Sequence, residues 1–188
     1  MTFFQQLNQF EIGILDWIQD VFQCGFLDWF FPLVTKLGDH GLFWMILAAV
    51  LLVFKKTRAT GAMMGVALLC GFLVGNMTLK PLIGRIRPYD ANEMRDVALL
   101  VERLSDFSFP SGHTLASLEG ATVLLIRDKR LGIPAMIAAI LVALSRLYLY
   151  VHYPTDVLVG AILGVLFAFF AVWFVKAVWK KFTKNELA

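Results

Sequence analysis

The chain has 188 residues, of which 59% are hydrophobic, with a net charge of +3 and a mean hydropathy of +0.73. A soluble domain is close to half apolar, so this composition excludes an ordinary soluble protein and indicates a membrane protein. The basic residues cluster in short loops rather than along one stripe, which excludes a nucleic-acid-binding surface and favours a membrane one. We expect one all-helical domain over residues 1–188, without repeats or linkers.

The first forty residues contain an amphipathic segment and a short apolar run. Over about residues 5–23, apolar residues recur at helical spacing, which predicts either an interfacial helix or the start of a first span. Residues 26–37 are apolar but short and contain Asp28 and Pro32, and residues 38–41 predict a turn. No basic residue precedes Lys36, so we expect no cleavable signal peptide.

Further apolar runs follow at residues 42–54, 60–79, 114–126, 131–151 and 156–178. A helix needs about 20 apolar residues to cross a bilayer, so the shorter runs must use flanking residues or tilt. We expect about six transmembrane helices, with five as the alternative, and the first forty residues decide between them. The polar loop that extends to about residue 109 contains one predicted short helix, at 97–104.

Clustered basic residues predict how the chain crosses the membrane. The loops 55–58 and 127–130 and the segment 180–184 each hold several lysines or arginines, which marks the cytoplasmic side. The long polar loop and the turn at 150–155 then lie on the outer side. The sequence therefore predicts a protein of the plasma (inner) membrane with a cytoplasmic C-terminus, and its small size favours a bacterial source.

Three polar clusters interrupt the apolar runs, and the predicted topology places all of them on the outer side. Charged groups in or beside a membrane are costly and are usually functional. In chain order the clusters are Lys80 with Arg87-Pro88, then Pro110-Ser111-Gly112-His113, then Ser145-Arg146 with His152 and Asp156.

The cations and the glycine of these clusters suit the binding of a phosphoryl group. Such a group carries charge on three oxygens during transfer, which fixed cations such as Lys80, Arg87 and Arg146 can neutralise. Ser111 and Gly112 precede an apolar helix, where backbone N–H groups bind anions and a glycine permits close approach. The sequence therefore predicts a phosphate site.

The two histidines can divide the remaining chemistry. One can attack phosphorus and become phosphohistidine, while the other protonates the leaving oxygen. Asp156 can hold one ring nitrogen of His152 protonated and leave the other free to attack. Because Pro154 disfavours helix at Tyr153, we expect that contact to run through a turn.

Together and in this order, the clusters resemble the type 2 phosphatidic-acid phosphatase family of membrane lipid phosphatases, which shares its site with vanadium haloperoxidases and bacterial acid phosphatases. The family pattern K-x6-RP, PSGH and SR-x5-H-x3-D is matched without departure, and the resemblance covers about residues 60–175, the expected catalytic core. It implies an acid phosphatase/haloperoxidase-like helical core and no metal or other cofactor. It also implies the roles of eight residues: nucleophile His152, general acid His113, His152 partner Asp156, and phosphate ligands Lys80, Arg87, Ser111, Gly112 and Arg146.

The expected activity is hydrolysis of a terminal phosphate on a lipid that stays in the bilayer. The motif residues account only for binding of that phosphate, so phosphatidic acid, phosphatidylglycerol phosphate and undecaprenyl diphosphate remain alternatives. We expect the 89–109 loop and the first forty residues to choose among them. The alternative function is a non-enzymatic membrane transporter or scaffold, which has no reason to place two histidines and three cations on one side. A haloperoxidase could carry the same site, but those proteins are soluble.

Several residues outside the motifs also receive an interpretation. Arg85 is interpreted as an interfacial anchor or a lipid-headgroup contact, and His40 as a turn residue. Glu119 is expected in the bundle interior, where it is structural or shapes the lipid pocket. Cys24 and Cys70 are interpreted as buried, inert thiols.

Overall fold

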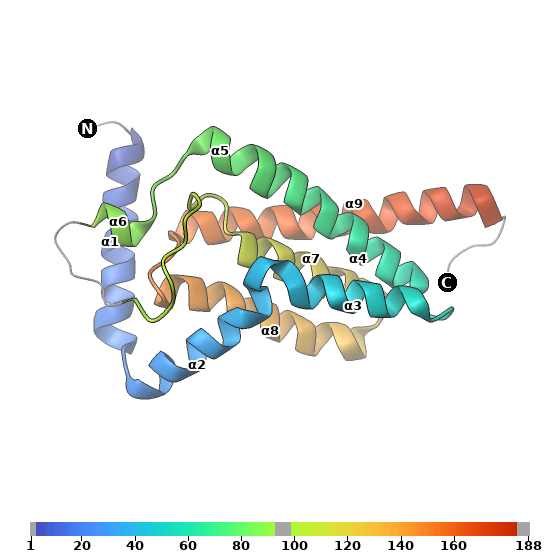
Figure 1. Cartoon of the computed structure of the whole chain (residues 1–188), viewed down its shortest axis with the longest axis horizontal. Coiled ribbons are helices and arrows are strands. Elements are labelled where there is room, and N and C mark those ends of the chain that lie inside the picture. The colour runs from blue at the N-terminus through green and yellow to red at the C-terminus, as the bar shows by residue number, and fades with distance from the viewer. Residues whose placement is uncertain (1–2, 93–98, 184–188) are drawn as a thin grey trace.

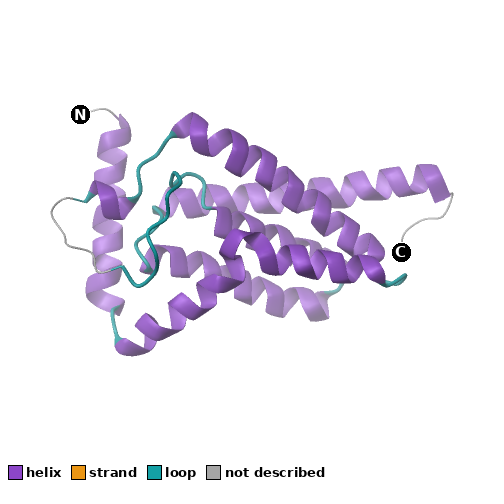
Figure 2. Cartoon of the chain, in the orientation of Figure 1, coloured by secondary structure: helices purple, strands orange, loops and turns teal. Residues whose placement is uncertain are grey.

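A computed structural model of the chain describes residues 3–92 and 99–183. Within these ranges the chain is helical, joined by loops and turns, with no strand (Figure 2). The elements in chain order are α1 (Phe3–Phe22), α2 (Gly25–Thr35), η1 (Lys36–Gly41), α3 (Leu42–Val53), α4 (Arg58–Gly71), η2 (Phe72–Leu79), α5 (Lys80–Ile83), α6 (Pro88–Ala91), α7 (Gly112–Arg127), α8 (Lys129–Tyr148) and α9 (Pro154–Thr183). The predicted all-α fold is confirmed for the described residues.

Helix α7 forms the centre of a bundle. It packs against α4, α8 and α9, and most of its side chains from residue 114 to 124 are buried. The long helices run roughly parallel, whereas α1 lies across one end of the bundle (Figure 1). The main apolar core lies around α7 and includes Trp44, Met63 and Met64, each at most 1% exposed.

Four helical segments are long and apolar enough to cross a bilayer, namely Gly25–Val53, Arg58–Ala91, Lys129–Tyr148 and Pro154–Lys181. The two short runs near the N-terminus join in the first of these, through the bend at η1. Helix α7 is parallel to them but has 16 residues and is enclosed by its neighbours. With α1 across the end, this arrangement fits the five-span alternative, while the count of six is not confirmed.

The outer surface of the bundle is apolar along its length. One face of α9 exposes half or more of five large apolar side chains, which are Leu158, Ile162, Leu166, Phe169 and Trp173. Exposure of a continuous apolar stripe of this size to water is unfavourable, so the stripe faces lipid. The membrane class predicted from composition is therefore supported by where the apolar residues lie.

Glycines let α9 approach the N-terminal end of α7 closely. A Cβ atom at Gly160 would lie 2.8 Å from the Ser111 carbonyl oxygen, and one at Gly164 would lie 2.7 Å from the Leu115 carbonyl oxygen. Small residues permit this contact between helix backbones in membrane proteins. As a result, the backbone N–H of Ser111 donates to the backbone oxygen of Asp156 at 3.1 Å, which joins the second and third motifs.

Two expectations about local structure are wrong. Residues 99–104 are not helical, and the rest of the helix expected at 97–104 lies outside the described residues. The segment instead follows an irregular path, held by the Tyr89 hydroxyl at Leu104. Cys24 is exposed at the junction of α1 and α2 rather than buried, and Cys70 is partly buried.

Candidate active site

The three motifs meet at the end of the bundle that α1 crosses (Figure 1). Lys80 begins α5, and Arg87 is the extended residue before α6. The second motif begins α7, and Arg146 lies in the last turn of α8. His152 follows in the turn before α9, whose first turn contains Asp156. Residues far apart in sequence are therefore gathered because five elements start or end here.

His152 is held on both ring nitrogens. Its Nδ1 lies 3.5 Å from Asp156 Oδ2, and its Nε2 lies 3.3 Å from Arg87 Nη1. A guanidinium can only donate, so Nε2 accepts and the proton of the neutral ring is on Nδ1, facing the carboxylate. This tautomer directs the Nε2 lone pair toward the cations. His152 is 1% exposed and Asp156 is 0% exposed, so the pair is shielded from water.

Asp156 is fixed by a turn, as the sequence predicted. Its Oδ2 accepts from the backbone N–H of Tyr153 at 3.0 Å, the reverse contact of a capping box at the start of α9. The Ser108 hydroxyl donates to the same oxygen. Ser108 is 0% exposed and belongs to no motif, so sequence reasoning missed it.

The phosphate-binding candidates Lys80 and Arg87 both pair with Asp106. Lys80 Nζ contacts Oδ2 of that carboxylate, and Arg87 Nη2 contacts Oδ1. Arg87 also donates from Nε to the Asp106 carbonyl at 3.0 Å and from Nη1 to the Val151 carbonyl at 2.8 Å. Asp106 could not be singled out from the sequence, because an acidic residue in a polar loop belongs to no motif or spacing pattern.

Arg146 is a buried cation with one unpaired donor among the described residues. It is 2% exposed, and its Nη1 donates to the Thr35 hydroxyl at 2.5 Å. Its Nε has no hydrogen-bond partner among the residues that the structure describes. Buried donors are nearly always paired, so this guanidinium is suited to receive an anion.

His113 is positioned by the bend between α2 and α3. Its Nε2 lies 2.8 Å from Asp39 Oδ1, and a Cβ atom at Gly38 would lie 2.8 Å from its ring. The bend needs left-handed backbone at His40 (φ 50°) and Gly41 (φ 66°), which bears out the predicted turn. The turn therefore brings the Asp39 carboxylate to His113, a contact that no pattern in the sequence predicts.

Ser111 and Gly112 form the start of α7. Ser111 is the N-cap, and its hydroxyl accepts from the Thr114 hydroxyl at 3.0 Å. Because α7 begins at Gly112, the first-turn N–H groups there have no partner four residues back in the helix. A Cβ atom at Gly112 would lie 3.1 Å from Asn76 Oδ1, so the glycine also permits a close helix contact.

Arg85 binds Asp156, which corrects its interpretation as an anchor or headgroup contact. Its Nη1 donates to Asp156 Oδ1 at 2.5 Å, and its Nη2 pairs with Glu11 Oε2 on α1. Asn8 accepts from the same guanidinium at 3.1 and 2.6 Å. Glu11 also accepts from the backbone N–H of Thr155 at 2.6 Å. Helix α1 is therefore joined to the start of α9 by a buried polar network.

The electrostatics of the site follow from this crowding. Burial, together with the charges of Arg87, Arg146 and Lys80, holds the pKa of His152 well below its ordinary value. Partial burial works to raise the pKa of Asp106, but the hydrogen bonds and charges of Lys80 and Arg87 outweigh it and lower the pKa to about 2. At neutral pH, His152 is therefore uncharged and Asp106 is an anion.

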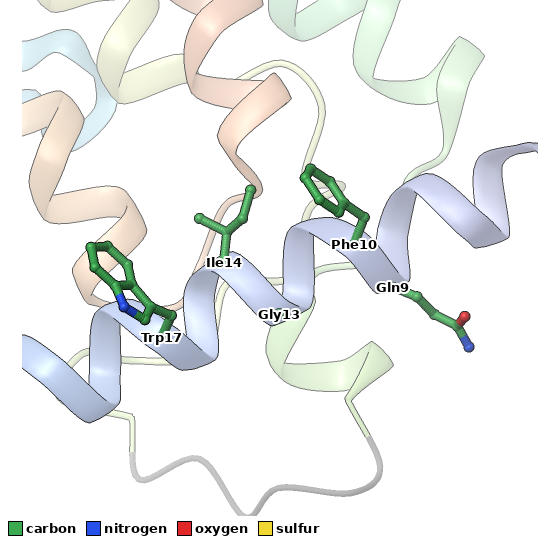
Figure 3. A pocket seen from close by; sticks show the side chains of 5 residues that line it. All are labelled: Gln9, Phe10, Gly13, Ile14 and Trp17. Atoms are coloured by element: carbon green, nitrogen blue, oxygen red, sulfur yellow. The ribbon is translucent and has the colours of Figure 1, made fainter.

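An apolar hollow lies outside this cluster of polar residues. A hollow of about 370 Å³ lies along α1, where Phe10, Ile14 and Trp17 point to one side and Gln9 to another (Figure 3). Its lining comes from α1 alone, so it is part of an apolar surface rather than the phosphate site. The described residues contain no group of three or more His, Cys, Asp or Glu side chains that could hold a metal ion.

Comparison with known proteins adds independent information. The family model of the PAP2 superfamily matches residues 58–180. An undecaprenyl-diphosphatase of Sulfolobus acidocaldarius is 36% identical over 130 residues, which are 69% of this chain and 62% of that protein. The chain thus spans less than two thirds of that relative.

Two solved structures share the fold. A PAP2-type phosphatidylglycerolphosphate phosphatase of Bacillus subtilis superposes with a TM-score of 0.71 and 28% identity, over 96% of this chain and 90% of that one. A bacterial vanadium-dependent iodoperoxidase superposes with a TM-score of 0.67 and 19% identity, over 91% of this chain and 49% of that one. The second likeness concerns the fold alone, and it agrees with the haloperoxidase-like core expected from the motifs.

Proposed function

The chain belongs to the PAP2 superfamily, and from that premise we propose that it hydrolyses the terminal phosphate of a membrane lipid through a phosphohistidine. The observation that carries the proposal is the pairing at His152, which has Asp156 on one ring nitrogen and Arg87 on the other. A neutral, oriented imidazole among cations is a nucleophile prepared for an anionic substrate. The curated and structural relatives that act on lipid phosphates support the same class of reaction.

In the first step, His152 Nε2 attacks phosphorus and the bond from phosphorus to the leaving oxygen breaks. Lys80, Arg87 and Arg146 neutralise the phosphoryl oxygens, and the N–H groups at the start of α7 add donors. Asp156 accepts from Nδ1–H throughout and stabilises the positive ring.

His113 supplies the proton to the leaving oxygen, so the lipid departs as an alcohol or as a lipid monophosphate. Asp39 stabilises the protonated form of His113 by accepting from Nε2–H. In the second step, His113 removes a proton from water, water attacks the phosphohistidine, and inorganic phosphate leaves while His152 is regenerated. Fixed cations perform the charge stabilisation, so the residues need no metal ion for these steps.

The lipid substrate enters from the bilayer. The exposed apolar stripe of α9 places lipid around the bundle, and α1 lies at the same end as the site (Figure 1). A headgroup at that end can reach the cations while its tail remains in hydrocarbon. We propose, from the basic loops, that this end faces the outer side of the membrane.

Phosphate release by the purified, detergent-solubilised protein tests the function and ranks the substrates together. The panel contains phosphatidic acid, phosphatidylglycerol phosphate and undecaprenyl diphosphate, with His152→Ala as the control for contaminating activity. Release that depends on His152 from at least one lipid supports the proposal. No release from any of them would favour a membrane transporter or scaffold instead.

A further inference from the structure

Asp106 occupies the position of an anion in the phosphate site. Its two carboxylate oxygens are divided between Lys80 Nζ and Arg87 Nη2, two of the three cations proposed to bind phosphate. Phosphate and carboxylate make the same kind of charge-assisted contact with lysine and arginine. The two cations cannot bind the carboxylate and the phosphate in this way at the same time.

The side chain of Asp106 has room to leave. It is 52% exposed, whereas the side chains of Lys80 and Arg87 are 10% and 3% exposed. The backbone around it is held separately, because Arg87 Nε binds the Asp106 carbonyl and the Ser108 N–H donates to the Arg85 carbonyl at 2.8 Å. Rotation about the side-chain bonds can therefore free the cations while the segment stays in place.

We propose that Asp106 is an internal competitor for the phosphate subsite, so that a substrate binds by replacing its carboxylate. The proposal rests on the proposed function, because it takes Lys80 and Arg87 as phosphate ligands. The apparent dissociation constant of any anion then equals its intrinsic value divided by the fraction of sites in which the carboxylate is turned away.

Because of this competition, an anion with low affinity for the two cations does not displace the carboxylate. A terminal phosphate monoester carries about 1.5 to 2 negative charges at pH 7, whereas a phosphodiester headgroup carries one, as the carboxylate does. Asp106 raises the dissociation constants of both by the same factor. At the high phospholipid concentration of a bilayer, that factor keeps weakly bound phosphodiesters out and leaves terminal phosphates as ligands.

The test compares Asp106→Asn with Asp90→Asn. Asp90 is a matched control because it also pairs with an arginine, Arg103, and is 42% exposed in the same part of the chain. Orthophosphate binding is measured by calorimetry, and inhibition of nitrophenyl phosphate hydrolysis is measured with orthophosphate and with phosphatidylglycerol micelles. In the wild type, two partly exposed ion pairs must open before phosphate binds. Asp106→Asn lacks them, so this variant should bind orthophosphate about tenfold more tightly. Phosphatidylglycerol should then inhibit Asp106→Asn but not Asp90→Asn.

Each other outcome has a defined meaning. Unchanged or weaker orthophosphate binding in Asp106→Asn, with an unchanged melting temperature, would overturn the competition and make Asp106 an orienting group for the cations. Asp106→Ala must shift the binding in the same direction as Asp106→Asn, or the proposal fails. If neither the wild-type protein nor the Asp106 variants bind orthophosphate, the proposed function fails as well, whereas equal binding by all of them removes only the competition.

Discussion

Replacing Arg85 with methionine keeps a side chain of similar length but removes the ion pairs that connect α1 to Asp156. Glu11 is 2% exposed and Asp156 is 0% exposed, so both carboxylates lose a buried partner. Removing one partner of a buried ion pair costs about 3–5 kcal/mol. Glu11 keeps two contacts from Thr155, and Asp156 keeps the Ser108 hydroxyl, so we expect the lower figure, about 3 kcal/mol. At about 2–4 °C per kcal/mol, the melting temperature should fall by about 6–12 °C.

The same substitution should slow the chemistry more than it weakens binding. Without Arg85, Oδ1 of Asp156 has lost its cation, so the carboxylate holds His152 Nδ1 less firmly. A displacement of about 1 Å in a reacting group can cost about 10²-fold in rate. We therefore expect kcat to fall about 10²-fold, with KM changed by about twofold or less because Lys80 and Arg87 remain.

The assay is steady-state hydrolysis of nitrophenyl phosphate by detergent-solubilised protein, with thermal unfolding followed in parallel. Arg130→Met is the control, since Arg130 is exposed at the opposite end of the bundle. Arg85→Lys keeps the charge without the fork and should recover part of kcat. A raised KM with unchanged kcat would show instead that Arg85 touches the substrate, and equal kcat in wild type and Arg85→Met would refute the positioning role.

Three further predictions concern the chemistry and the topology. His152→Ala should form no phosphoprotein. His113→Ala should hydrolyse a lipid about 10²–10⁴-fold more slowly, with a smaller loss in the rate of single-turnover nitrophenol release. Phosphoprotein in His152→Ala but not in His113→Ala would reverse the two roles. Hydrolysis should persist in excess EDTA, and loss restored by magnesium or zinc would assign the charge stabilisation to a metal. In a Cys24→Ser background, a cysteine at Ser105 should react with an impermeant thiol reagent in intact cells and one at Lys56 should not; the opposite labelling would place the site in the cytoplasm.

The sequence predicted the parts of the fold that depend on composition and local pattern. The apolar runs predicted the long helices, and the topology inferred from the basic loops placed the phosphate candidates on one side of the membrane. It could not give the path of the first forty residues. The short run at 26–37 joins the next run, at 42–54, through a bend whose geometry depends on Gly41 and on contact with α7.

The candidate site was predicted where a spacing rule exists and missed where none does. The contact between His152 and Asp156 follows from their separation and the intervening proline. Asp39 and Asp106 reach the site from a bend and an irregular loop, so only tertiary packing brings them there. Arg85 was misread because a basic residue at a helix end usually anchors to a membrane surface, and its partner Glu11 lies 74 positions away.

The network between α1 and α9 also affects how the protein is made. Glu11 binds the backbone N–H of Thr155, a contact between residues 144 positions apart. A chain synthesised from its N-terminus can pair Glu11 with Arg85 before α7 has been made, but the contact with Thr155 must wait until α8 is complete. Helix α1 can therefore be joined to α9 only late in assembly, so the contacts around Asp156 and the proposed nucleophile His152 are completed last.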